Sequence, residues 1–483
     1  MDRPAAGAAA GVGDQPVLRQ MTQHHIVDQL PVAVLARRDR TLEPPHRLAP
    51  LDRTQVVEEV DLVGHLRACE RFRARANLPE PATAPMVRRL LRRITTHPRY
   101  AELRQNLQLP EYAGTRFTAR RVLNLYLARW ESARGRTRLW SRPTKLTVEA
   151  TNICNLGCPA CFTGAGDLGR PRSHLSLDLY RQVLAELAPY LLEVEFYNWG
   201  EPLLAKHIFP MIEEASAAGA HTTVSTNFSF PFDAARAERL VSSGLSVLGV
   251  SIDGARQESY EQYRRRGKLA TVLENCRAVR DAKRRLGSAT PRLVWEFHVF
   301  RHNTEDIEQA RALAHELEMD IAVDKGWVVG SEWDTEGKFR YYADPTPHRC
   351  PFLWTQAVIN NDGGVAPCCG TFFHEDDMGA LPAERGAPGA RSFREIWNNP
   401  KFRASRRFFR SRTGSPDEQQ LACYECPITK IWENYGQHVA AGGTRETFQV
   451  GYSTNDCFNY FWNRRPVPPA AANAGGRPAA LAR

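Results

Sequence analysis

Hydrophobic positions follow two alternating periods through the middle of the chain. Short apolar runs typical of strands are followed by longer segments in which apolar residues recur every three or four positions. The predicted strands are 145–150, 192–199, 221–226, 246–253, 293–300 and 320–324. The predicted helices are 176–191, 205–218, 233–243, 259–286 and 305–317. Strands alternating with helices form parallel sheets, so we predict an α/β fold, a partial (β/α)6 TIM-like barrel.

The segments on either side of this alternation have a different character. The start is rich in Ala, Pro, Gly and Arg, and three helical patterns follow at 56–76, 84–107 and 116–134. We expect a small α+β domain after the barrel. The predicted organisation is a flexible arm at 1–50, an N-terminal helical domain at 51–142, the barrel at 143–330, the small domain at 345–430 and a C-terminal segment with a flexible tail at 431–483.

Composition narrows the class of protein. The chain has 483 residues, of which 42% are hydrophobic, and no apolar run approaches the roughly 18 to 20 residues that cross a bilayer. Because the first residues lack an apolar export signal, we expect a cytoplasmic protein without membrane contact. The odd count of 11 cysteines fits a reducing compartment better than a disulfide framework.

The net charge of +10 is concentrated in one region. Residues 86–142 hold fourteen arginines and only three acidic residues. Such a region could attract an anionic ligand or simply form a solvated helical face, and both interpretations stay open. No nucleic-acid-binding motif accompanies it, so we expect no nucleic-acid partner.

Three cysteines directly follow the first predicted strand. Cys154, Cys158 and Cys161 have the spacing Cys-x3-Cys-x2-Cys and no nearby fourth thiol. A structural zinc ion requires four protein ligands, whereas a [4Fe–4S] cube bound by three cysteines keeps one iron open for another ligand. The pattern therefore favours an iron–sulfur cluster over a zinc site.

This stretch resembles the cluster loop of the radical S-adenosylmethionine (radical SAM) superfamily. The resemblance implies a [4Fe–4S] cluster whose open iron binds S-adenosylmethionine, and reductive cleavage of that cofactor to a 5'-deoxyadenosyl radical. One departure is visible, since Ala160 stands before the third cysteine where an aromatic residue is usual, and Phe162 follows it. A flavodoxin- or ferredoxin-type electron donor is implied as well.

Further motifs fall at the ends of the predicted strands, where ligands of such folds bind. The turn Gly200-Glu201-Pro202 resembles the family's Gly-Gly-Glu-Pro motif with Trp199 in place of the first Gly, and implies contacts to the cofactor's ammonium group. By the same resemblance, side chains at later strand ends hold the cofactor's ribose, and an arginine on the turn that follows the fourth strand pairs with its carboxylate. These residues are Ser225, Asn227, Ser251, Asp253 and Arg264.

A second set of cysteines follows the barrel. It resembles the short, one-cluster "twitch" form of the SPASM extension, which implies a second, auxiliary [4Fe–4S] cluster. The implied ligands are Cys350, Cys368, Cys423 and Cys426. Trp432 occupies the position of the next SPASM cysteine. A four-cysteine zinc site is the competing interpretation, and Cys369 could replace its neighbour as a ligand.

The resemblance implies an enzyme that abstracts a hydrogen atom from a small biosynthetic intermediate, such as a sugar or aminocyclitol, and oxidises it with help from the auxiliary cluster. A maturase acting on a ribosomally made peptide and a redox-neutral epimerase or dehydratase are alternatives. For the redox-neutral case Cys457 is the candidate catalytic thiol, and an inert thiol packed in its aromatic segment is the competing interpretation. An iron–sulfur electron carrier would not need the cofactor motifs.

Overall fold

The computed structural model describes most of the chain from residue 115 to residue 443. The described residues are 115–166, 169–325, 333, 350, 352–382, 392–411, 421–424, 426, 438 and 440–443. The chain divides into two compact units, of which one is Leu30–Tyr112 and the other comprises Met1–Gln29 and Ala113–Arg483. All described residues belong to the second unit. The predicted arm, the helical patterns at 56–76 and 84–107, and the tail lie outside them.

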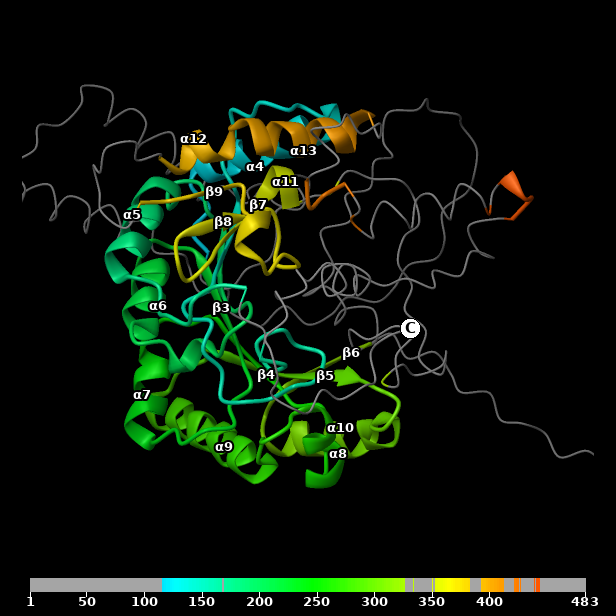
Figure 1. Ribbon diagram of the computed structural model, residues 1–483. Helices are drawn as coiled ribbons and strands as arrows, with labels where there is room; N and C mark the ends of the chain where they lie inside the picture. Colours follow the sequence, from blue (N-terminus) through cyan, green and yellow to red (C-terminus); the bar gives the residue numbers. More distant parts are fainter. Residues whose placement is uncertain are drawn as a thin grey trace, which may run out of the picture. The chain divides into compact units, whose positions relative to one another are not determined.

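A parallel sheet forms the centre of this unit, with its first six strands in sequential order (Figure 1). Each strand pairs in parallel with the next, as in the partial barrel that the alternation predicted. The strands are β1 (Lys145–Val148), β2 (Glu193–Phe196), β3 (His221–Thr226), β4 (Val247–Ser251), β5 (Arg292–Val299) and β6 (Asp320–Lys325).

Helices return the chain from each strand to the next. They are α5 (Leu177–Leu187), α6 (Ile208–Ala217), α7 (Ala234–Ser242), α8 (Gln257–Tyr263), α9 (Leu269–Leu286) and α10 (Ile307–Glu316), with short 3-10 turns η2 (Pro202–Leu204) and η3 (Thr304–Asp306). Side-chain caps begin two of them, because the oxygens of Ser176 and Asp233 accept hydrogen bonds from backbone N–H groups of the first turn.

The two faces of the sheet differ in chemistry because side chains alternate along each strand. Residues such as Val148, Phe196 and Leu248 are fully buried in one apolar core that also includes the inner sides of the helices. The opposite face, which we call the polar face, carries the alternate positions. It includes Lys145, Thr147, Glu193, Glu195, Ser225, Ser251, Glu296 and His298.

One predicted helix is divided into two in the structure. The sequence pattern predicted a single helix at 259–286, but the chain forms α8 and α9 with a turn between them. Arg264 ends α8, and Arg266 adopts a left-handed backbone with φ of 69°. The periodic pattern continues through the turn, so periodicity alone did not reveal the break.

The small C-terminal domain joins the same sheet. Strand β7 (Gln356–Ile359) pairs in parallel with β1, and β8 (Gly364–Ala366) and β9 (Gly379–Ala380) follow in antiparallel order. Gly363 lies in the turn between β7 and β8, with φ of 87°. Helices α11 (Phe352–Thr355), α12 (Phe393–Trp397) and α13 (Pro400–Ser411) complete its described part. A capping box between Ser392 and Glu395 begins α12.

Helix α4 (Ala119–Arg134) belongs to the arginine-rich region and packs within the same unit. Arg121 is only 2% exposed and donates hydrogen bonds to the carbonyl oxygens of Arg116, Ala188 and Ala218. At least one arginine of this region therefore binds backbone carbonyl oxygens inside the protein and does not belong to a solvated helical face. None of the helices in the described part of the chain combines the length and the apolar character that a membrane crossing requires.

Candidate active site

The cysteine loop leaves the carboxyl end of β1 and is held by the loop after β2. The Glu201 N–H donates to the Ile153 carbonyl oxygen at 2.9 Å. Gly200 allows this contact, because a Cβ there would lie 1.9 Å from the Thr151 carbonyl oxygen. The glycine of the Gly-Glu-Pro motif is therefore required by the close approach of two backbones.

The three thiols share one environment. Burial, reinforced by the Glu201 carboxylate and the other two thiols, raises the pKa of Cys154 to about 12. Burial likewise raises the pKa of Cys158 to about 11, although Arg264 opposes it. Within the described residues no three metal-binding side chains are arranged around a single ion. Three thiols on one loop are the donor set of a cluster that keeps one iron open for another ligand.

The turn between α8 and α9 packs against the cysteine loop. Arg264 donates hydrogen bonds to the Asp253 carboxylate at 2.6 Å and to the Cys158 sulfur. Arg266 donates a hydrogen bond to the Leu156 carbonyl oxygen. Its guanidinium also packs on Gly157, because a Cβ on that glycine would lie 3.2 Å from the Arg266 side-chain nitrogens. The predicted arginine thus lies beside the cluster loop, where its charge would stabilise thiolates.

Glu201 is a buried anchor in this structure. Its side chain accepts hydrogen bonds from the Thr226 hydroxyl and the Asn227 N–H, both at 2.7 Å, and from the Leu203 N–H at 3.0 Å. Burial raises its pKa to about 7 despite these donors. Glu201 thus joins the end of β3 to the cysteine loop, the first through its carboxylate and the second through its backbone N–H. Contact with the cofactor's ammonium group stays a prediction. Pro202 begins the short turn that follows.

Asn227 reaches the cysteine loop directly. Its side-chain amide lies 3.6 Å from the Cys154 sulfur and 3.1 Å from the Asn155 side-chain oxygen. A donor near the sulfur of a cluster ligand is the type of contact that tunes a cluster's reduction potential. The structure therefore brings Asn227, Glu201 and Arg264 together around the three thiols, as the strand-end rule predicted.

Asp253 is completely buried, and its carboxylate has partners within the chain. Arg264 binds one oxygen, while the other accepts from the His298 N–H at 2.9 Å and lies 3.0 Å from the His298 ring nitrogen. Burial alone would raise the pKa of Asp253, but Arg264 and His298 outweigh it and lower the pKa to about 2. Its direct contact is therefore with the arginine, and ribose binding stays a prediction.

Ser225 and Ser251 meet at a carboxylate that the sequence analysis missed. Both hydroxyls donate to Glu296 on β5, at 2.7 Å and 3.1 Å. A Cβ on Gly249 of β4 would lie 2.2 Å from the Glu296 carboxylate. The glycine at this position therefore leaves room for the carboxylate. The alternation of Trp295-Glu296-Phe297 within an apolar strand was the available signal, because an acidic residue there must face away from the core.

The second set of cysteines is assembled from three separate segments. Burial, followed by the charges of Cys369, Cys426, Cys423 and Cys350, raises the pKa of the Cys368 thiol well above its usual value. Burial and then Cys426 and Cys423 do the same for Cys350. Four thiols that interact in this way, with Cys350 and Cys423 buried, fit an auxiliary cluster.

Cys369 faces a different environment from Cys368. Its thiol is hydrogen-bonded to the Tyr197 hydroxyl and lies near the charges of Glu195 and Lys145. The two neighbouring thiols therefore have different partners, and the contact of Cys368 with the other three thiols supports it as the ligand. Cys457 lies outside the described residues.

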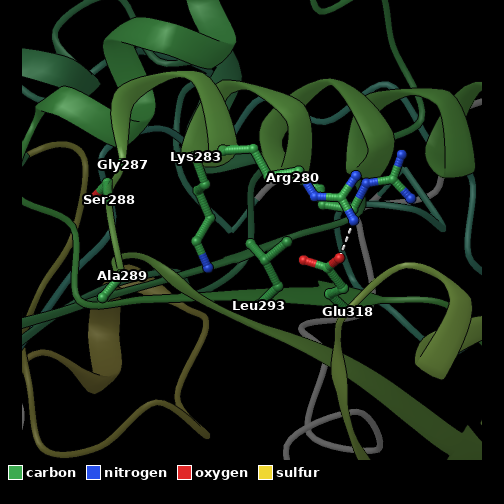
Figure 2. A pocket seen from close by; sticks show the side chains of 8 residues that line it. Arg280, Lys283, Gly287, Ser288, Ala289, Leu293 and Glu318 are labelled. Carbon is green, nitrogen blue, oxygen red and sulfur yellow. Dashed lines mark hydrogen bonds and ion pairs between the residues drawn. The ribbon is translucent and has the colours of Figure 1, made fainter.

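A surface pocket of about 320 Å³ lies elsewhere, at the end of α9 (Figure 2). Arg280, Lys283, Arg284 and Glu318 line it, and Figure 2 shows the Glu318 carboxylate facing the basic side chains. The end of α9 leads to the beginning of β5. The pocket therefore lies near the amino end of a strand, whereas the cysteine loop follows the carboxyl end of β1. We assign it no part in the site.

Among known proteins, the chain is similar to the "AdoMet-dependent heme synthase" of Methanosarcina barkeri, with 28% identity over 341 residues, which are 60% of this chain and 90% of that protein. It is 29% identical to the "PqqA peptide cyclase" of Bradyrhizobium diazoefficiens over 26% of this chain and 33% of that protein. These relatives carry different names, so similarity alone does not identify a substrate.

Two solved structures show weaker likeness. SuiB of Streptococcus suis bound to S-adenosylmethionine has 15% identity, covers 74% of this chain and 88% of its own, and gives a TM-score of 0.46. BtrN in complex with AdoMet and 2-DOIA has 17% identity, covers 65% of this chain and 98% of its own, and gives a TM-score of 0.38.

Two family models match the segments that the cysteines delimit. The model of the radical SAM superfamily matches residues 148–314, and that of the SPASM iron–sulfur cluster-binding domain matches residues 350–427. The first covers β2 to β5 with the cysteine loop, and the second contains all four cysteines of the auxiliary set. The chain is therefore an enzyme of the radical SAM superfamily that carries a SPASM domain, with S-adenosylmethionine and iron–sulfur clusters as its cofactors.

Proposed function

We propose that this enzyme abstracts a hydrogen atom from a small polar intermediate, such as a sugar or an aminocyclitol, and that the net reaction is an oxidation. When bound, the first cluster and S-adenosylmethionine supply the 5'-deoxyadenosyl radical. The chain's own residues hold the cysteine loop, orient the substrate on the polar face and exclude water from one side of the sheet. We place the enzyme in the cytoplasm with a flavodoxin- or ferredoxin-type donor, because its seven ligand thiols must stay reduced.

The polar face is the observation that carries this proposal. Lys145 lies 2.5 Å from Glu195 at the start of this face, and Ser225 and Ser251 surround Glu296 farther along it. Such groups can exchange these internal contacts for hydrogen bonds to the hydroxyl or amino groups of a substrate, whereas an apolar substrate offers them none. The face lies beside the strand ends that hold the cysteine loop.

The oxidative outcome is supported by the second set of cysteines. Its described thiols lie close enough to interact, and the SPASM model matches the whole segment. A redox-neutral reaction would need a hydrogen donor instead. Cys457 is our candidate for that donor, and it makes the two outcomes separable by experiment.

A peptide maturase is the second candidate. The observation that favours it is the similarity to the PqqA peptide cyclase, although that match covers 33% of the relative. An electron carrier is disfavoured because the chain is an enzyme of the superfamily.

The test combines substrate panels with isotope tracing. The reduced enzyme, S-adenosylmethionine and panels of aminocyclitols, sugars or short peptides are incubated without oxygen, and 5'-deoxyadenosine and products are followed by mass spectrometry. We expect an aminocyclitol or sugar to raise 5'-deoxyadenosine formation and to lose two mass units. Stimulation by peptides alone would overturn the small-substrate proposal.

The same assay in deuterated water distinguishes oxidation from a redox-neutral reaction. We expect Cys457→Ala to retain turnover, since oxidation requires no returned hydrogen atom. Solvent deuterium at an unactivated carbon of the product, lost in Cys457→Ala, would contradict oxidation.

A further inference from the structure

Four aromatic side chains form one cluster that touches segments of both cysteine sets. Phe162 is fully buried and stacks on Phe372, with their ring centroids 4.7 Å apart. Trp199 meets both rings edge-on at 5.2 Å, and Phe373 packs against Phe162 at 5.5 Å. We call these four residues the aromatic bridge.

The positions of the rings in the sequence explain why the bridge matters. Phe162 directly follows Cys161, and Trp199 directly precedes the Gly-Glu-Pro turn. Phe372 follows Cys368 by four residues, and Ala422, the neighbour of Cys423, belongs to the same packed cluster. The bridge therefore joins a ligand segment of the first cluster to two ligand segments of the second.

Hydrogen bonds fix the bridge in place. The Trp199 ring N–H donates to the Thr371 carbonyl oxygen at 3.0 Å, and the Thr371 hydroxyl donates to the Cys368 carbonyl oxygen at 2.9 Å. A Cβ on Gly169 would lie 2.5 Å from the Phe372 ring, so the segment after the cysteine loop also closes on it.

We propose that the aromatic bridge is the positioning element that sets the auxiliary cluster at a fixed distance and orientation from the first cluster. Aromatic rings suit this task because they are rigid and prefer defined edge-to-face and offset geometries. Close packing also transmits a change in one ring to its neighbours. The inference rests on the presence of two clusters, but not on the identity of the substrate.

The same bridge explains the departure in the cysteine motif. The aromatic residue next to the third cysteine stands after it, and its ring packs toward the C-terminal domain. Phe162 thereby contributes to the junction between the domains, while Ala160 lies at the edge of the same cluster.

The experiment measures the interaction between the two reduced clusters by pulsed electron paramagnetic resonance. The variants are Phe372→Leu and Phe373→Leu, and the matched control is Phe402→Leu. Phe402 is fully buried and packs edge-on against Trp397 at 4.9 Å, within the C-terminal domain but outside the bridge. All variants are assayed for iron content and melting temperature.

We expect Phe372→Leu to keep both clusters while the spin–spin interaction shifts or its distance distribution widens at least twofold. Phe373→Leu should do so less, and Phe402→Leu should leave the interaction unchanged at a similar loss of melting temperature. Phe372→Tyr, which keeps an aromatic ring in the bridge, should keep the wild-type distribution.

An unchanged spin–spin interaction in both bridge variants, with a loss of melting temperature equal to that of Phe402→Leu, would overturn the proposal. If Phe372→Leu does not fold, Phe373→Leu decides the question by the same criterion. A wild-type protein with only one cluster would refute the assignment of the auxiliary cluster, an outcome that iron analysis distinguishes from a failure of the bridge.

Discussion

The two cysteine sets reach similar chemistry by different routes. The first set lies within eight residues on one loop, and its neighbours on β2, β3 and the α8–α9 turn contact that loop through Glu201, Asn227 and Arg264. The second set comes from segments that are far apart in the sequence, and its thiols interact in a domain whose strand β7 pairs with β1.

The two sites therefore depend on different contacts for their stability. A short loop has little closure entropy to overcome, so the first set depends mainly on local anchors. The second set depends on the folding of the whole C-terminal domain onto the sheet. We therefore expect local substitutions to affect the first cluster and domain-level contacts to affect the second.

The largest expected effect comes from the first set. Replacing Cys154, Cys158 and Cys161 together by Ala should abolish formation of 5'-deoxyadenosine, because no site for the cofactor-binding cluster remains, and should remove about half of the iron. The assay is anaerobic incubation with dithionite and S-adenosylmethionine. Cys276→Ala, which removes a fully packed thiol of α9, serves as the control and should keep all iron. Remaining 5'-deoxyadenosine in the triple variant would refute the cluster assignment.

Cys368 and Cys369 allow a matched test of the ligands in the second set. Cys368→Ala should lose about four irons, the content of one cluster, because Cys368 faces the other three thiols. Cys369→Ala should keep them, since that thiol is bonded to Tyr197. Iron and sulfide analysis of both variants checks this prediction. Iron loss in Cys369→Ala with retention in Cys368→Ala would reverse the ligand assignment.

Removal of Arg264 tests the electrostatic anchor of the first set. Arg264→Ala leaves the buried Asp253 carboxylate without its main partner, and we expect a loss of about 3 to 5 kcal/mol in the free energy of unfolding. The same change should weaken binding of S-adenosylmethionine. Chemical denaturation and equilibrium binding measure the two effects.

The control for Arg264 is Arg285→Ala, whose ion pair with Glu238 is exposed on both sides and should contribute less than about 1 kcal/mol. Equal effects of the two substitutions would show that Arg264 has no special role beside the cluster loop.

A smaller effect is expected where the segment after the cysteine loop meets the β8 hairpin. The Arg170 side chain, only 2% exposed, donates to Asp377 at 2.6 Å and to Asp362 at 3.0 Å. Asp377→Ala should cost about 3 kcal/mol because its side chain is buried, and Asp362→Ala about 1 kcal/mol because its side chain is 24% exposed. Denaturation curves give both values, and the opposite ranking would contradict the burial argument.

Much of the fold was predictable from local patterns. Alternation located all six strands of the barrel, because this signal lies within a few neighbouring residues. The break between α8 and α9 was missed, since the chain departs from a helix there to let Arg266 reach the cysteine loop. Tertiary contacts outweighed local periodicity at that point.

Spacing singled out candidate ligands of the site but not their contacts. It could not show that Asp253 and Glu201 have their direct partners within the chain. It also gave no sign that Phe162 would pack toward Phe372, because that contact joins residues 210 positions apart. Long-range pairing, such as that of β1 with β7, has no signature in either segment alone.

The most direct test of the two-cluster account is elemental analysis and Mössbauer spectroscopy of the protein purified and reconstituted without oxygen. We predict about eight irons and eight sulfides per chain, all in [4Fe–4S] clusters, with no stoichiometric zinc. Replacing Cys350, Cys368, Cys423 and Cys426 by Ala should leave about four irons. A native protein with about four irons and one zinc ion would contradict the account, because the second cysteine set would then be a structural zinc site.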